Sequence, residues 1–93
     1  MFKVTVRYFN LIGDSLGKKS EVISLEEHST FQDLVKALLE MYGDKLRELL
    51  LDEDGSLLPH IRVFINDGIM NPQLGEALKE GDEVSFFVAV VGG

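Results

Sequence analysis

The chain has 93 residues, a formal net charge of −7 and no cysteine. This length suits one domain with a single core, and the lack of cysteine excludes a disulfide scaffold, a thiolate metal site and a persulfide-carrying side chain. An acidic chain is a poor partner for nucleic acid or an anionic membrane and a better one for a basic protein surface. The apolar runs are too short to span a bilayer and the N-terminus does not resemble a signal peptide, so a cytoplasmic location is expected.

The first strand is predicted at residues 2–9, where apolar and polar residues alternate. Its inward set is Phe2, Val4, Val6 and Tyr8, and its outward set is Lys3, Thr5, Arg7 and Phe9. Residues 10–19 contain Gly13 and Gly17 and are predicted to form a loop. A second strand follows at residues 20–25, with Ile23 and Leu25 inward, which completes an N-terminal hairpin.

The main helix is predicted to begin at Ser29 or Thr30, because either can cap a helix and Asp33 follows in the first turn. Gly43 is suited to end it. The apolar residues recur at helical spacing and predict a core-facing stripe: Phe31, Leu34, Val35, Leu38, Leu39 and Tyr42. A shorter helix, capped by Asp44, is predicted at 44–51. The acidic residues at 52–54 lack the ligand spacing of a calcium loop and indicate a solvated turn.

A third strand is predicted at residues 61–66, with Ile61, Val63 and Ile65 inward. The sequence Asn-Asp-Gly at 66–68 is typical of a tight turn, and residues 69–70 are expected to add a short strand. Residues 72–80 are expected to form a helical turn under the sheet, and the last strand begins at Val84. No metal site is expected, because His28 and His60 are well separated in the sequence.

This order of elements leaves one main helix to cover one face of the sheet, since no second layer is available to it. If the first and last strands lie side by side, the result is an α+β fold of the ubiquitin-like β-grasp type. The sheet is then mixed and four- to five-stranded, with the main helix packed on one face. The chain is expected to be a single domain, 1–93, in which 89–93 form a flexible C-terminal Gly-Gly tail.

The face that the helix leaves uncovered is predicted to carry three phenylalanines, Phe9, Phe64 and Phe87. Large apolar side chains that are exposed together usually mark a protein partner site. Phe9 and Phe87 both stand at the ends of their strands, so parallel strands would place them near the root of the tail. The alternative is that segments 10–19 or 44–58 cover each ring.

The chain ends in Gly92 and Gly93. Two glycines without a Cβ can enter a narrow channel and expose the terminal carboxylate to an enzyme. A frayed terminus would have the same sequence, so this pair gains its meaning from the rest of the chain.

Several motifs together resemble the small sulfur-carrier subunit of molybdopterin synthase, in the MoaD/ThiS family of ubiquitin-like proteins. The similarity runs nearly end to end. Its motifs are Val6-Arg7-Tyr8-Phe9 with Gly17, Thr30-Phe31-Gln32-Asp33-Leu34, Phe64-Ile65-Asn66, Gly81-Asp82-Glu83-Val84-Ser85-Phe86-Phe87, and Val90-Val91-Gly92-Gly93. One departure is the pair Val88-Ala89, where family members often carry two prolines.

The resemblance implies that an ubiquitin-activating-like enzyme uses ATP to adenylate the Gly93 carboxylate, which sulfur then converts to a thiocarboxylate. It further implies that the large subunit of molybdopterin synthase takes up the tail, and that the sulfur builds the dithiolene which holds molybdenum or tungsten. On this view the chain binds no cofactor and is not catalytic alone; it is the sulfur-donating subunit of a sulfurtransferase complex. The partner-binding residues would be Phe9, Phe64, Ile69, Phe87, Val90, Val91 and Gly92.

Three other functions remain open. The same tail could form isopeptide bonds with lysines, as in archaeal ubiquitin-like modifiers that resemble this family. It could carry sulfur for thiamine or cysteine synthesis instead. Finally, the domain could be a plain binding module whose C-terminus takes no part in chemistry.

Overall fold

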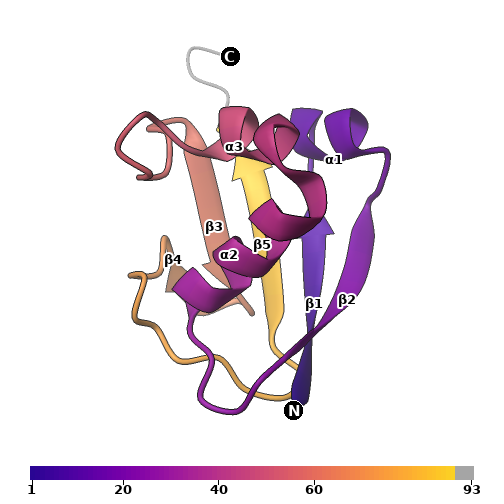
Figure 1. The fold of residues 1–93 in the computed structure, drawn as a ribbon, viewed down its shortest axis with the longest axis vertical. Helices are drawn as coiled ribbons and strands as arrows, with labels where there is room; N and C mark the ends of the chain where they lie inside the picture. The colour runs from indigo at the N-terminus through magenta and orange to yellow at the C-terminus, as the bar shows by residue number, and fades with distance from the viewer. Residues whose placement is uncertain (90–93) are drawn as a thin grey trace.

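The structure, a computed structural model, describes residues 1–89. Five strands form one mixed sheet in the order β2-β1-β5-β3-β4 (Figure 1). They are β1 (Phe2–Tyr8), β2 (Ser20–Leu25), β3 (Ile61–Ile65), β4 (Ile69–Met70) and β5 (Glu83–Val88). The first and last strands lie side by side and run parallel at the centre of the sheet. The predicted β-grasp architecture is thus confirmed.

Helix α2 (Phe31–Tyr42) crosses one face of the sheet, as Figure 1 shows, and buries Phe31, Leu34, Val35 and Leu38. Its start is fixed by a capping box: the Thr30 side chain accepts from the Asp33 amide, and the Asp33 carboxylate accepts from the Thr30 amide. These bonds satisfy backbone donors that have no partner within the helix. Thr30, not Ser29, is therefore the cap, and Gly43 ends the helix as predicted.

The core lies between α2 and the sheet, and the alternation in the strands accounts for it. The inward residues predicted for β1, β2 and β3 are all buried. Phe86 on β5 is fully buried and lies against both Tyr8 and Phe31, with ring centroids 6.3 Å apart in each pair. No helix in the part of the chain that the structure describes is long and apolar enough to cross a membrane.

The prediction of a loop at residues 10–19 was wrong, because the structure has a short helix, α1 (Leu11–Leu16), in this segment. Ile12 anchors it in the core. Gly13 lies inside the helix because a Cβ there would stand 2.7 Å from the carbonyl oxygen of Tyr8. Close approach of two backbones, and not loop flexibility, is what requires this glycine. Gly17 ends the helix in the left-handed conformation.

Two further details differ from prediction. Helix α3 (Asp44–Leu50) is preceded by Gly43, and Asp44 makes no capping hydrogen bond. Residues 72–80 form no helix and contain one tight turn, which the hydrogen bond from the Glu76 amide to the Gln73 carbonyl closes. They run past the start of α2, where the carbonyl groups of Glu76 and Leu74 accept hydrogen bonds from the amides of Phe31 and Gln32. The first donors of α2 thus find acceptors in the carbonyl groups of this segment.

The described chain stays attached to the sheet as far as Ala89, whose amide donates to the carbonyl of His60 at 2.7 Å. The predicted tail, 89–93, otherwise lies outside the described residues, as do the site residues Val90, Val91, Gly92 and Gly93.

Candidate functional site: the outer sheet face and the tail root

The outer face of the sheet carries a compact aromatic cluster made of Phe9, Phe64 and Phe87. The Phe9 and Phe87 rings are stacked, with centroids 4.3 Å apart and an interplanar angle of 5°. Phe64 meets Phe87 edge to face at 5.4 Å. All three side chains are partly buried, mutually packed and on the face opposite α2. The structure therefore brings together the three phenylalanines that the alternation placed on this face.

Strand register explains why the rings meet. The parallel pair β1–β5 aligns Tyr8 with Phe86, so that Phe9 continues opposite Phe87. The Phe9 amide donates to the carbonyl of Phe86 at 3.0 Å, which extends the ladder past the end of β1. In the antiparallel pair β3–β5, Phe64 faces Ser85, one step diagonal to Phe87. Side chains at diagonal positions on one sheet face lie within reach of aromatic rings.

Ile69 lies elsewhere. The β3–β4 register pairs Ile69 with Ile65, whose side chain is buried, and pairs Met70 with Phe64. Opposed residues in an antiparallel pair share a face. Ile69, which is 39% exposed, is therefore on the side of the sheet away from the aromatic cluster, while Met70, 62% exposed, is on the same side as Phe64. A contact between Ile69 and a partner stays a prediction. Sequence reasoning missed Met70, and the register of the Asn-Asp-Gly turn was the signal that could have identified it.

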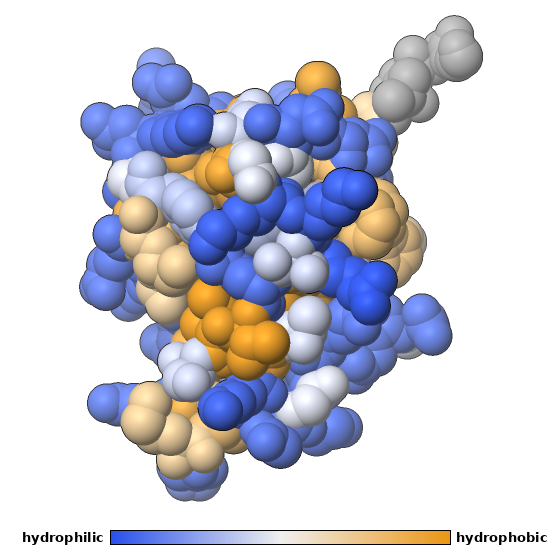
Figure 2. All heavy atoms as spheres, turned by 90° about the vertical axis from the view of Figure 1, so that its right-hand side faces the viewer, coloured by the Kyte–Doolittle hydropathy of each residue, from blue (hydrophilic) through white to orange (hydrophobic). Residues whose placement is uncertain are grey.

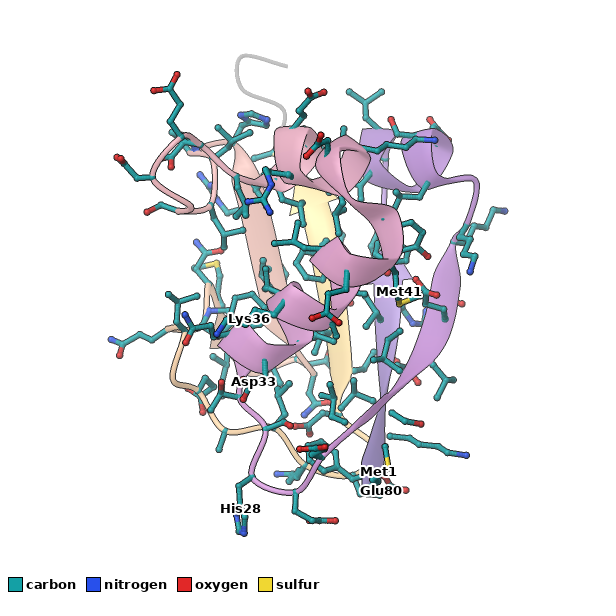
Figure 3. All side chains as sticks on the ribbon, viewed as in Figure 1. Met1, His28, Asp33, Lys36, Met41 and Glu80 are labelled. Atoms are coloured by element: carbon teal, nitrogen blue, oxygen red, sulfur yellow. The ribbon has the colours of Figure 1, made fainter. Side chains whose placement is uncertain are left out.

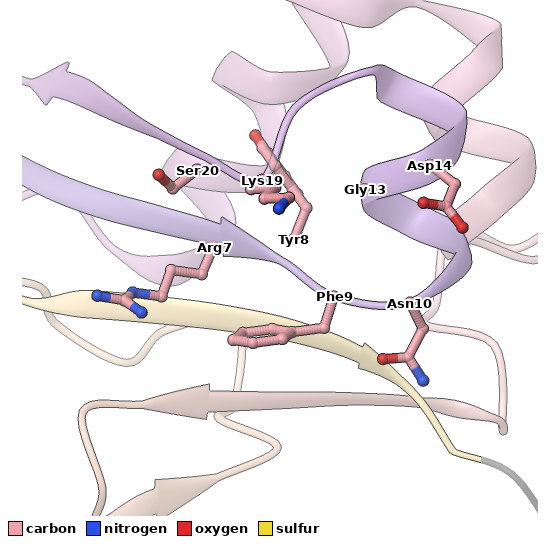
Figure 4. Close-up of a pocket in the computed structure, with 8 residues that line it drawn as sticks. All are labelled: Arg7, Tyr8, Phe9, Asn10, Gly13, Asp14, Lys19 and Ser20. Carbon is pink, nitrogen blue, oxygen red and sulfur yellow. The ribbon is translucent and has the colours of Figure 1, made fainter.

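The tail root, Val88 and Ala89, is held from two sides. On one side Ala89 bonds to His60, in the segment before β3. On the other side the Asn10 side chain donates to the carbonyl of Val88 at 3.4 Å. In Figure 4 the Phe9 ring lies against β5 and Asn10 extends toward the point where that strand ends. The chain thus leaves the sheet from a fixed point next to the aromatic cluster.

A shallow hollow of about 380 Å³ adjoins the cluster, between the end of β1, helix α1 and the start of β2. The eight residues that line it are Arg7, Tyr8, Phe9, Asn10, Gly13, Asp14, Lys19 and Ser20 (Figure 4). Charged groups surround the aromatic surface here. Arg7 pairs with Glu83 on the outer face at 3.2 Å, and both side chains are about half exposed, so the pair adds little stability.

Most of the shifted pKa values belong to a cluster around Glu21, on the face of the sheet that α2 covers. The Glu21 carboxylate accepts hydrogen bonds from the Tyr8 and Tyr42 hydroxyls and from the Lys18 ammonium group. Burial raises the pKa of Glu21, but hydrogen bonds from Tyr42, Tyr8 and Lys18 outweigh it and hold that pKa below its usual value. Burial, followed by the hydrogen bond to Glu21, raises the pKa of Tyr8 and of Tyr42. This cluster joins β1, β2 and α2 and lies apart from the tail root.

Within residues 1–89, no three side chains of histidine, cysteine, aspartate or glutamate are grouped so that they could hold a metal ion. Figure 3 shows His28 at the end of the molecule opposite to the end where β5 finishes. The arrangement combines a partly exposed aromatic cluster with an anchored point at which the chain leaves the sheet.

Comparison with known proteins gives this surface a context. A profile of the ThiS family matches residues 6–93. The crystal structure of SAMP1 from Haloferax volcanii is similar at 28% identity and a TM-score of 0.85, over 98% of this chain and 99% of that one. A putative molybdopterin converting factor, subunit 1, from Pyrococcus furiosus has 28% identity and a TM-score of 0.76, over 97% of this chain and 100% of that one.

A third similar structure is the complex of subunits 1 and 2 of molybdopterin-converting factor from Helicobacter pylori 26695. It has 25% identity and a TM-score of 0.65, over 99% of this chain and 100% of the matched chain. A comparison with curated protein sequences gives no significant match. The family match covers nearly the whole chain, including the C-terminal glycine pair, and the fold agrees with it: this chain belongs to the ThiS family of ubiquitin-like sulfur carriers and modifiers.

Proposed function

We propose that this chain is the sulfur-carrying small subunit of a molybdopterin synthase. The observation that supports this most is the placement of the aromatic cluster beside the tail root. A partner that docks on Phe9, Phe64 and Phe87 meets the tail root, Val88 and Ala89, at a fixed position beside that surface. Similarity to molybdopterin converting factor subunit 1, including one relative in complex with subunit 2, supports the same assignment.

The proposed chemistry takes place on Gly93. A carboxylate is a poor electrophile, so its oxygen first attacks the α-phosphorus of ATP on an ubiquitin-activating-like enzyme, and pyrophosphate leaves. A sulfur nucleophile at the oxidation level of sulfide then attacks the acyl carbon, AMP leaves, and a thiocarboxylate remains. The large synthase subunit receives the tail, and this sulfur attacks a pterin precursor to begin the dithiolene. The side chains of this subunit supply the docking surface, and the partners supply the catalytic groups.

The first experiment is an intact-mass measurement after incubation with a candidate activating enzyme, ATP and a sulfur donor. A gain equal to the exchange of one oxygen for one sulfur is expected. The matched control is a variant without Gly93, which keeps every described residue and should gain nothing. An unchanged mass, with an activating enzyme shown to be active on its own carrier, would contradict the proposal.

The second experiment assigns the pathway. The thiocarboxylated protein is mixed with the large subunit of molybdopterin synthase and the pterin precursor, and dithiolene formation is measured. The Phe87→Asp variant should still gain the thiocarboxylate mass in the first experiment. Its complex with the large subunit should be weaker by at least about tenfold, because the substitution puts a charge in the centre of an aromatic contact. Sulfur transfer to a thiamine or cysteine precursor instead would place the carrier in one of those pathways.

Protein conjugation is the second candidate, and one observation favours it: SAMP1, an archaeal modifier, has the higher TM-score, 0.85 against 0.76 for the converting-factor subunit. A tagged chain isolated from cells under denaturing conditions would then carry lysine isopeptide adducts through Gly93. Adducts that vanish in the variant without Gly93 would support this function, and a cell could use both.

A further inference from the structure

Strand β2 has a free edge. It stands at one end of the sheet order, and among residues 1–89 its one strand partner is β1. The Tyr8 amide donates to the carbonyl of Lys19, so Lys19, Glu21, Ile23 and Leu25 turn their backbone groups toward β1. Alternation in an antiparallel pair then directs the backbone groups of Ser20, Val22 and Ser24 away from the sheet. The opposite edge is different, because β4 is only two residues long.

An exposed edge of this length invites pairing, and proteins usually prevent this with lysine, proline or a bulge within the strand. None of these stands inside β2, whose sequence is Ser-Glu-Val-Ile-Ser-Leu. Its one charged residue, Glu21, points to the helix-covered face, where Tyr8, Tyr42 and Lys18 donate hydrogen bonds to its carboxylate. Val22 is 61% exposed. Figure 2 looks onto this side of the molecule and shows apolar surface bordered by hydrophilic residues. The edge therefore offers unpaired backbone groups next to an exposed β-branched side chain.

The charges at the two ends of β2 have opposite signs, so two copies of the strand are complementary when they run antiparallel. Lys18 and Lys19 precede it, and Glu26 and Glu27 follow it. In an antiparallel arrangement of two such strands, each basic end meets the acidic end of the other. Lys18 already bonds Glu21, and Glu27 bonds the N-terminal ammonium group. Lys19 and Glu26 are both exposed and take part in no ion pair within residues 1–89.

We propose that β2 is a homodimer interface at which two copies of this chain pair antiparallel about Val22. Side chains that face each other across an antiparallel pair lie on the same face of the sheet. The register must therefore align even-numbered residues of one β2 with even-numbered residues of the other. Pairing Val22 with Val22 of the second copy meets this condition and matches Ser20 with Ser24. Three hydrogen-bonded pairs give about six new hydrogen bonds between the copies.

This arrangement leaves the candidate site open. The two-fold axis stands perpendicular to the sheet, so both aromatic clusters lie on the same face of a continuous ten-stranded sheet. The two β5 strands are roughly 24 Å apart across the sheet, at five steps of about 4.8 Å. The two β5 strands point in opposite directions, and the tail roots are therefore at opposite ends. The dimer is compatible with partner binding and is independent of the proposed function.

The dimer should be weak. One strand edge buries far less than the roughly 1,600 Å² of a typical stable interface. We expect a Kd on the order of 10⁻⁴ M, so that most chains are in dimers only above about 0.1 mM. Sedimentation equilibrium between about 10 μM and 2 mM covers this range. A monomer mass over the whole range would overturn the proposal.

Backbone amide spectra locate the contact. On dilution, the amide signals of Ser20, Val22 and Ser24 should shift, and those of Phe9, Phe64 and Phe87 should not. Shifts confined to the aromatic cluster would show association through the outer face instead and would overturn the β2 assignment.

Two sets of variants test the pairing itself. Val22→Pro removes an amide that points away from β1, so it should abolish dimers and leave the monomer folded, because edge strands tolerate proline there. Val22→Thr keeps the amide and is the control that should still dimerise. In this register Lys18 lies opposite Glu26 of the second copy, so Lys18→Glu and Glu26→Lys should each weaken the dimer about tenfold through like-charge contacts on both sides of the axis. The double variant restores opposite charges and should recover it; failure to recover would overturn the proposed register.

Discussion

Phe9 and Phe87 stack with their rings 4.3 Å apart and nearly parallel, although one follows the first strand of the chain and the other belongs to the last. The contact exists only because β1 and β5 are parallel neighbours with Tyr8 aligned to Phe86. It therefore reports the assembly of the whole sheet and, at the same time, forms the centre of the surface that we propose for docking.

The stacking energy can be measured with a double-mutant cycle on Phe9→Ala and Phe87→Ala. A coupling of about 0.5–1.5 kcal/mol in the free energy of unfolding is expected, the range found for aromatic pairs. Urea unfolding followed by circular dichroism provides the four stabilities. Phe64→Ala combined with Phe9→Ala is the comparison, since Phe64 packs against Phe87. Strict additivity of the first pair would show that the rings do not interact in solution.

The Glu21 cluster predicts an unusual alkaline titration. The chain has two tyrosines and no tryptophan, and both tyrosines donate to Glu21. Since the pKa values of both are raised in the folded state, their contribution to stability is complete below the unfolded value of about 10 and is lost as pH rises above it. Tyrosinate absorbance should appear at higher pH in the native protein than in urea. Glu21→Gln should reduce the difference in tyrosine titration midpoint between native and urea-unfolded protein. Equal midpoints in water and in urea for the parent chain would contradict the hydrogen bonds from the tyrosines to Glu21.

The Glu21 carboxylate also predicts how the stability of the protein changes at acidic pH. The pKa of Glu21 is lowered on folding, so its contribution is present above the unfolded value of about 4.3 and is lost as pH falls through the lower folded value. Urea unfolding at a series of pH values should show a smaller loss of stability on acidification for Glu21→Gln than for the parent chain. Parallel curves for the two proteins would count against this assignment.

Gly13 and Gly17 should respond differently to alanine. A Cβ at Gly13 meets the Tyr8 carbonyl oxygen at 2.7 Å, whereas nothing lies within 4 Å of one at Gly17. We expect Gly13→Ala to cost about 1–3 kcal/mol through overpacking. Gly17→Ala should cost about 1–2 kcal/mol, the penalty of a left-handed residue. Backbone amide shifts separate the two: those of Tyr8 and Phe9 should move in Gly13→Ala only.

Ala89→Pro tests the anchoring of the tail root. Proline has no amide hydrogen, so the bond from Ala89 to the His60 carbonyl is lost. The expected cost is about 0.5–1.5 kcal/mol, measured by urea unfolding. Ala89→Ser keeps the donor and should be close to neutral. Equal stability of the proline and serine variants would mean that this bond contributes nothing.

The sequence predicted the strands, the main helix and the aromatic cluster, because each depends on periodicity or on a local cap. Alternation in residues 2–9 placed Phe9 outward, and Thr30 with Asp33 defined the start of α2. Helix α1 was missed because Gly13 normally disfavours helices, and only the approach of the Tyr8 carbonyl shows why it is there. Residues 72–80 were missed for a related reason: their backbone serves the amides of α2, a contact that no side-chain pattern encodes.

The candidate site was predictable in part. The alternation of side chains along the strands identified Phe9, Phe64 and Phe87. It could not give the β3–β4 register, which puts Met70 and not Ile69 beside Phe64. Nor could it show that Asn10 holds the carbonyl of Val88, since the two residues meet only after β5 takes its place in the sheet.

The central position of β5 also has a consequence for biosynthesis. This strand is made after every other described strand, yet it joins β1 to β3, and without it the described sheet is two separate pieces. A nascent or truncated chain that lacks it exposes two unpaired strand edges and has no aromatic surface to present. Folding of the complete sheet must therefore wait until the chain as far as Val88 has emerged from the ribosome. Any partner that recognises the stacked rings thereby selects chains in which β5 has been made and has taken its place in the sheet.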